Sequence, residues 1–76
     1  MPHLTPISYK KFEKFLLYIG CTFKRQKGSH RVYWRTDLVR PVIVPAHKKL
    51  SVFVIRTNLR TLNISHEQYL EILNKM

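Results

Sequence analysis

Acidic residues are scarce in this chain of 76 residues: 4 Asp plus Glu stand against 14 Lys plus Arg, which gives a formal net charge of +10. Ten of the basic residues lie between positions 24 and 60, where Asp37 is the single acidic residue. Such an excess repels itself unless a polyanion screens it, so the charge favours a phosphate-rich partner. The alternative is a solvated basic surface that only keeps a small protein soluble.

Cysteine occurs once, as Cys21, so no internal disulfide can form, and no Cys/His pair has the spacing of zinc ligands. Long apolar runs are also missing, which excludes a membrane span, while 45% hydrophobic residues are too many for a disordered chain. The first residues lack the pattern of a secretory signal, so we expect a cytoplasmic protein. The length predicts a single domain, residues 1–76, with a thin core and with any chemistry on its surface.

The hydrophobic period changes twice along the chain. Apolar residues at helical spacing predict a helix over residues 8–19, with Ser8 as N-cap and Gly20 after its end. Alternation then predicts a β-hairpin with strands 21–26 and 29–34 and a turn at Lys27-Gly28, and β-branched residues predict a third strand over 39–44. Two further helices are expected, one from Ser51 through Arg60 and one after a capping box at Ser65 and Gln68.

The hairpin register predicted from this turn pairs Gln26 with Ser29 and Arg25 with His30. It places an apolar set on one face of the sheet with Arg25 and His30 at its end: Cys21, Phe23, Val32 and Trp34. It places a more polar set on the other face: Thr22, Lys24, Arg31 and Tyr33. The resulting α-β-β-β-α-α order predicts an α+β fold, a three-stranded antiparallel sheet with helices on one face.

The hairpin also carries the best candidate for chemistry. Histidine changes charge near neutral pH, so His30 could remove the proton of an RNA 2′-hydroxyl or protonate a leaving 5′-oxygen without a metal or other cofactor. Gly28 lets the backbone turn beside a phosphate, and Ser29 would hydrogen-bond within the turn. Basic neighbours would oppose the charge that grows on the reacting phosphate: Arg25, Lys27 and Arg31.

The segment Gln26-Lys27-Gly28-Ser29-His30, together with Val44-Pro45-Ala46-His47 and the order of the elements, resembles the HicA (YcfA-like) mRNA interferase toxins. The resemblance implies a fold similar to double-stranded-RNA-binding domains, an endoribonuclease that cuts mRNA, His30 as the catalytic histidine and a HicB-type antitoxin as protein partner. Phe53-Val54 departs from the usual Gly-Thr before the second helix, and Asn63 replaces the usual glycine.

Other residues are weaker candidates. His47, in a basic loop with Lys48, could bind phosphate or act as the complementary acid or base. Three aromatic residues among the Arg and Lys residues are candidates for base stacking: Tyr33, Trp34 and Phe53. Core packing is the alternative, which we expect for Trp34 and Phe53 and which is open for Tyr33. We expect no metal, since no carboxylate lies near the two histidines in sequence. The main alternative function is an RNA-binding module without catalysis; a helix-turn-helix DNA binder would need a more basic final helix than His66 to Met76 provides.

Overall fold

The computed structural model describes residues 4–46 and 49–76. Three helices and five strands follow one another in these residues. Their bounds are β1 Ile7–Ser8, α1 Tyr9–Tyr18, β2 Thr22–Lys27, β3 His30–Trp34, β4 Val42–Pro45, β5 Lys49–Leu50, α2 Val52–Leu62 and α3 His66–Lys75.

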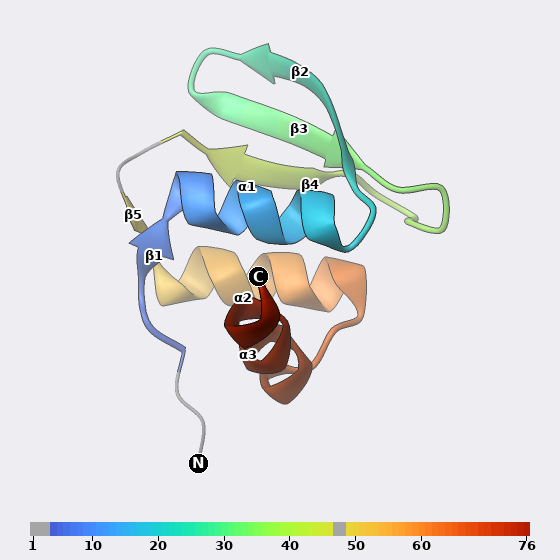
Figure 1. Cartoon of the computed structure of the whole chain (residues 1–76). Helices are drawn as coiled ribbons and strands as arrows, with labels where there is room; N and C mark the ends of the chain where they lie inside the picture. The colour runs from blue at the N-terminus through green and yellow to red at the C-terminus, as the bar shows by residue number, and fades with distance from the viewer. Residues whose placement is uncertain (1–3, 47–48) are drawn as a thin grey trace.

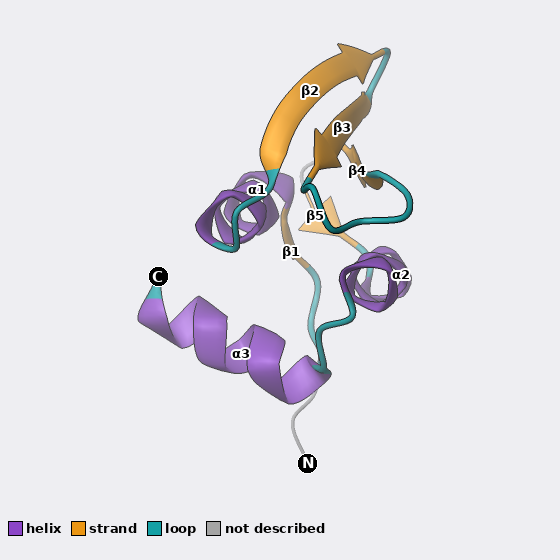
Figure 2. Ribbon diagram, turned by 90° about the vertical axis from the view of Figure 1, so that its right-hand side faces the viewer, coloured by secondary structure: helices purple, strands orange, loops and turns teal. Residues whose placement is uncertain are grey.

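The main sheet is antiparallel and has the strand order β2-β3-β4. Helices α1 and α2 lie side by side against one face of this sheet, and α3 crosses beneath them (Figures 1 and 2). This arrangement confirms the predicted α+β fold with helices on one face. The sequence pattern did not predict β1 and β5, which form a separate two-residue ladder between Ile7 and Leu50.

The predicted helix starts are confirmed by their capping bonds. The hydroxyls of Ser8, Ser51 and Ser65 accept from the backbone N–H groups of the third helical residues: Lys11, Val54 and Gln68. Ser65 and Gln68 form the expected reciprocal capping box. Gly20 and Asn63, at the ends of α1 and α2, have positive φ angles of 95° and 58°.

The hairpin turn lies one residue later than predicted, and the partner of His30 therefore moves by two residues along β2. Lys27 pairs with His30, so the two-residue turn is Gly28-Ser29, and the predicted pairing of Arg25 with His30 is wrong. The register shifts between Phe23 and Arg25, which marks a β-bulge at Lys24. Beyond the bulge Arg25 pairs with Val32, so Arg25 still shares a face with His30 and Val32, as predicted.

The bulge also exchanges residues between the two faces. Phe23 pairs with Tyr33, and their rings meet edge to face at 5.7 Å, so Phe23 shares the face of Tyr33 and not, as predicted, that of Val32 and Trp34. Thr22 instead shares a face with Trp34. Tyr33 is 0% exposed, so the face predicted to be polar is the buried one, while Trp34 is only half-buried.

Two further predictions are wrong: the start of the third strand and the burial of Phe53. Val39 is exposed and β4 begins only at Val42, because Pro41 has no N–H to donate to the ladder. Phe53, expected in the core, is 76% exposed on α2. The buried stripe predicted for α2 is confirmed, because Ile55, Leu59 and Leu62 are all buried.

The core lies between the sheet and the helices. An aromatic cluster joins α1 to α3: Phe15 meets Tyr69 edge to face at 4.9 Å and Phe12 at 5.4 Å. Cys21 is buried, as predicted, and this burial raises the pKa of its thiol. The remaining core side chains come from every layer of the fold: Leu16, Tyr33, Val42, Val44, Leu50, Ile55, Leu59 and Leu62.

Candidate nucleic-acid interface

The candidate site begins at the tight turn between β2 and β3. Gly28 has a φ of 59°, a left-handed conformation that side-chain-bearing residues rarely adopt. The Gln26 side-chain amide donates to the Gly28 carbonyl at 2.9 Å, and the Ala46 N–H donates to the Ser29 carbonyl at 2.6 Å. The second bond ties the turn to the end of β4, so the residue after the turn, His30, is held at a fixed place opposite Pro45.

The position of the Gly28-Ser29 turn decides which side chains surround His30. Paired residues of an antiparallel ladder share a face, so Lys27 lies beside His30 and Arg25 lies beside Val32. These side chains line one shallow depression on the sheet face turned away from the helices, together with Gly28 and Ile43. Within the described residues, neither Arg25 nor Lys27 has an ion-pair partner. The structure therefore brings one histidine and two uncompensated cations together at the surface.

Arg31 lies on the opposite face, although the sequence grouped it with Arg25 and Lys27. Its guanidinium forms an ion pair with Glu13 of α1, at 2.7 Å between Nη2 and Oε2, and donates to the Gln26 amide oxygen at 2.7 Å. It also lies 4.3 Å from the ring centre of Phe23. The Tyr33 hydroxyl donates to the same Glu13 oxygen. The structure thus directs Arg31 toward α1 and away from His30.

This cluster shifts the pKa values of its members. The hydrogen bond from Tyr33, followed by the contacts with Arg31, lowers the pKa of Glu13 below its ordinary value. Burial, with the carboxylate as hydrogen-bond partner, raises the pKa of Tyr33 to about 12. Glu13 is therefore a carboxylate and Tyr33 a neutral phenol at pH 7. The cluster holds the hairpin to α1 with its charges already matched.

A groove of about 330 Å³ opens on the other side of His30. Its walls come from the end of β3, from β4 with the residues before it, and from the exposed side of α2, where Phe53 lies. His30 and Ile43 line both this groove and the depression that holds Arg25 and Lys27, so the two hollows meet at His30. From the sequence, base stacking at Phe53 is only the alternative to core packing, and the 76% exposure of this side chain contradicts the core position.

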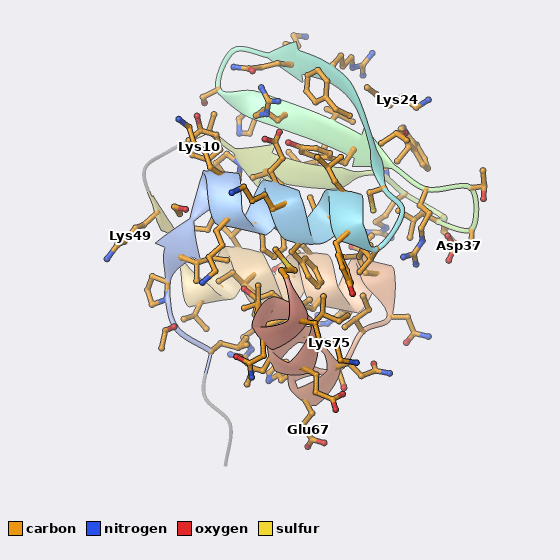
Figure 3. All side chains as sticks on the ribbon, viewed as in Figure 1. Lys10, Lys24, Asp37, Lys49, Glu67 and Lys75 are labelled. Carbon is orange, nitrogen blue, oxygen red and sulfur yellow. The ribbon has the colours of Figure 1, made fainter. Side chains whose placement is uncertain are left out.

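Charge is distributed unevenly over the molecule. Lys24 projects from the sheet at one end, whereas Glu67 and Lys75 project from α3 at the other (Figure 3). α3 carries both signs of charge, with Glu67 in its first turn and Lys75 in its last. The basic hairpin is therefore the more suitable part of the described structure for a polyanion.

Several sequence predictions are not tested by this geometry. His47 and Lys48 lie outside the described residues. Among residues 4–46 and 49–76, no group of three potential metal ligands comes together; metal-independent chemistry stays a prediction. No helix in the described part of the chain has the length and apolarity needed to span a membrane.

Fold and site together define a small basic α+β domain that presents a histidine on a β-hairpin whose turn contains a glycine. A family model described as the HicA toxin of bacterial toxin-antitoxin systems matches residues 9–64. The match covers more than half of the chain, which therefore belongs to the HicA toxin family. It includes the hairpin, the three-stranded sheet and α2, whereas α3 lies beyond it. No curated protein matches the chain.

Proposed function

We propose that this toxin is a metal-independent endoribonuclease that cuts mRNA, with His30 as its general acid or base. The observation that carries the proposal is the exposed face on which His30, Arg25 and Lys27 lie together beside a glycine turn. No carboxylate lines this depression within the described residues, so its local charge suits an RNA phosphate. Membership of a toxin family supports the same reading.

In the proposed reaction the 2′-oxygen of a ribose attacks the neighbouring phosphorus, and the bond to the 5′-oxygen breaks. Neutral His30 would accept the 2′-hydroxyl proton, or protonated His30 would donate a proton to the departing 5′-oxygen, and solvent water would carry out the other proton transfer. The products are a 2′,3′-cyclic phosphate and a 5′-hydroxyl. Arg25 and Lys27 would stabilise the negative charge that accumulates on the phosphate oxygens in the transition state.

RNA binding is assigned to the turn and the cations around it. Gly28 has no side chain, and nothing lies within 4 Å of where a Cβ would stand, so a phosphate can approach the backbone there. Ser29 would support the turn and the bound phosphate. His47 and Lys48 follow Pro45, the partner of His30 in the ladder, and remain predicted phosphate contacts. Arg31 would have to leave Glu13 to join them, so we assign it to positioning the hairpin.

The protein partner we propose is an antitoxin of the HicB type with an acidic surface that covers this face. It would silence the toxin by competing with RNA for Arg25 and Lys27. Ion pairs at such an interface weaken as salt rises, so the complex should loosen at high ionic strength. Purification from the native host at low salt should therefore recover a stoichiometric acidic protein; recovery of RNA alone would contradict this partner.

Cleavage of a labelled single-stranded RNA in EDTA tests the proposed activity. His30→Ala should lower the rate by about 10²- to 10⁴-fold, the usual contribution of general acid-base catalysis, while RNA binding persists. His66→Ala is the matched control, because His66 is also exposed but lies on α3. Binding without cleavage by the wild-type protein would identify an RNA-binding module instead. Loss of wild-type activity in EDTA would overturn the metal-independent mechanism.

A further inference from the structure

The groove beside His30 has a composition that the proposed acid-base chemistry does not require. Its walls include Pro41, Ile43 and Phe53, which are all apolar, and two of these are well exposed: Ile43 by 38% and Phe53 by 76%. A single exposed apolar residue is ordinary, but here several line one concave surface. Its volume of about 330 Å³ is near the lower end of the range of small-ligand pockets, about 300–1,000 Å³.

Two polar residues complete the groove. Arg40 is exposed at its rim, whereas Asn58 is only 6% exposed and donates through Nδ2 to the Ile43 carbonyl at 3.1 Å. A primary amide has two N–H donors and an acceptor oxygen, so this bond fixes Asn58 and uses only one donor. The described lining contains no acidic residue. The groove thus combines an aromatic ring, a cation and a fixed amide.

We propose that this groove binds one base of the RNA, with the base stacked on Phe53. The inference rests on the proposed function, because it takes His30 as the place where the reacting phosphate lies. A nucleotide's base is joined through its ribose to that phosphate, and His30 lines the groove. Aromatic side chains and arginines commonly hold unpaired bases in this way. Asn58 presents the hydrogen-bonding groups by which proteins read a base edge.

The charge of the groove favours RNA over an apolar peptide as its occupant. Arg40 lines the groove, and the cations Arg25 and Lys27 line the depression on the other side of His30. An extended polyanion that crosses the depression and the groove would satisfy all three charges while it buries the exposed ring of Phe53. An apolar peptide would cover the ring and leave the cations without partners.

Binding by the cleavage-deficient His30→Ala protein separates this proposal from the chemistry. The probe is a fluorescein-labelled, single-stranded octaribonucleotide of mixed sequence, and the readout is its dissociation constant by fluorescence anisotropy. Adding Phe53→Leu, which keeps an apolar side chain but removes the ring, should weaken binding by about 5- to 150-fold. The double variant with His30→Ala and Phe53→Tyr keeps an aromatic ring and should bind the RNA as tightly as His30→Ala alone. The dependence of affinity on salt should stay the same, because no phosphate contact is lost.

Tyr18→Leu is the matched control, since Tyr18 is also an exposed aromatic residue, 57% accessible, but lies at the end of α1. It should leave the affinity unchanged. If His30→Ala binds the RNA equally well with and without Phe53→Leu, the base site is overturned and the nuclease proposal stands. Failure of every variant to bind the RNA would overturn the RNA-directed function itself. Unchanged RNA binding with a weakened antitoxin complex would assign the groove to the protein partner and overturn the base site.

Discussion

The two faces of the hairpin use the same kinds of residue in opposite ways. On the face toward α1, Arg31 is paired with Glu13, and Tyr33 is fully buried over the same carboxylate. On the face away from the helices, Arg25 and Lys27 have no ion-pair partner among the described residues and lie beside the exposed His30. Alternate residues of β3 thus belong to a structural cluster and to a candidate site.

The difference shows that the number of basic residues in the hairpin does not by itself define its binding surface. Arg31, whose charge is already matched, contributes to holding the hairpin on α1. Its transfer to an RNA phosphate would break the ion pair and leave the Glu13 carboxylate without its charged partner. A cation without a partner can contact phosphate with no such loss. The assignment of the site therefore depends on the direction of each side chain, which the register of the hairpin sets.

The largest expected effect on stability comes from the helix-side face. Tyr33→Ala removes a ring that is 0% exposed and should lower the free energy of unfolding by about 3–5 kcal/mol. His30→Ala, on the outer face, should change it by no more than about 0.5 kcal/mol. Urea unfolding of both variants measures the contrast. Similar losses for the two substitutions would show that the faces are not separated as described.

A smaller effect is expected at Glu13. Glu13→Gln should cost about 1–3 kcal/mol at pH 7, because it removes the charged partner of Arg31 and Tyr33. The folded-state pKa of Glu13 is lowered, so its stabilisation is present above the ordinary glutamate pKa, about 4.3, and is lost as pH falls through the folded-state pKa.

Urea unfolding from pH 7 to pH 3 measures this dependence. The wild-type protein should lose stability in acid, and Glu13→Gln should lose less. Part of the dependence should remain in the variant, because Arg35 also lowers the pKa of Asp37. Identical pH profiles for the two proteins would mean that the Glu13 cluster does not stabilise the hairpin.

The smallest change is expected in the salt dependence of RNA binding. Arg25→Gln with Lys27→Gln should flatten the plot of log affinity against log salt by about 1.4, if each side chain contacts one phosphate of a single strand. Lys11→Gln with Lys14→Gln removes the same charge from exposed positions on α1 and is the control. Equal flattening by both pairs would show that net charge, and not the outer face, governs binding.

Local chemistry explains why so much of the fold was predictable from the sequence. Each helix start depends on a serine and the backbone N–H three residues later, and the ends at Gly20 and Asn63 depend on a single left-handed residue. The exposed position of His30 beside a glycine turn is equally local. These features need no knowledge of distant contacts.

Several of the features that escaped prediction depend on contacts between segments that are separated in the chain. The bulge at Lys24 arises from the way β2 pairs with β3, and the alternation of residues alone cannot reveal it. The β1–β5 ladder is too short to leave a pattern. Whether Phe53 is buried depends on which side of α2 packs on the sheet, and whether Arg31 is free depends on Glu13, eighteen residues earlier.

The rate of RNA cleavage in EDTA as a function of pH, compared between the wild-type and His30→Ala proteins, tests the central claim most directly. The wild-type rate should follow a group that titrates between about pH 5 and 8, the range in which histidine changes its charge. The residual activity of His30→Ala should lack that titration while RNA binding and folding persist. A wild-type rate independent of pH, or the same profile and rate in His30→Ala, would contradict His30 as the proton-transfer group.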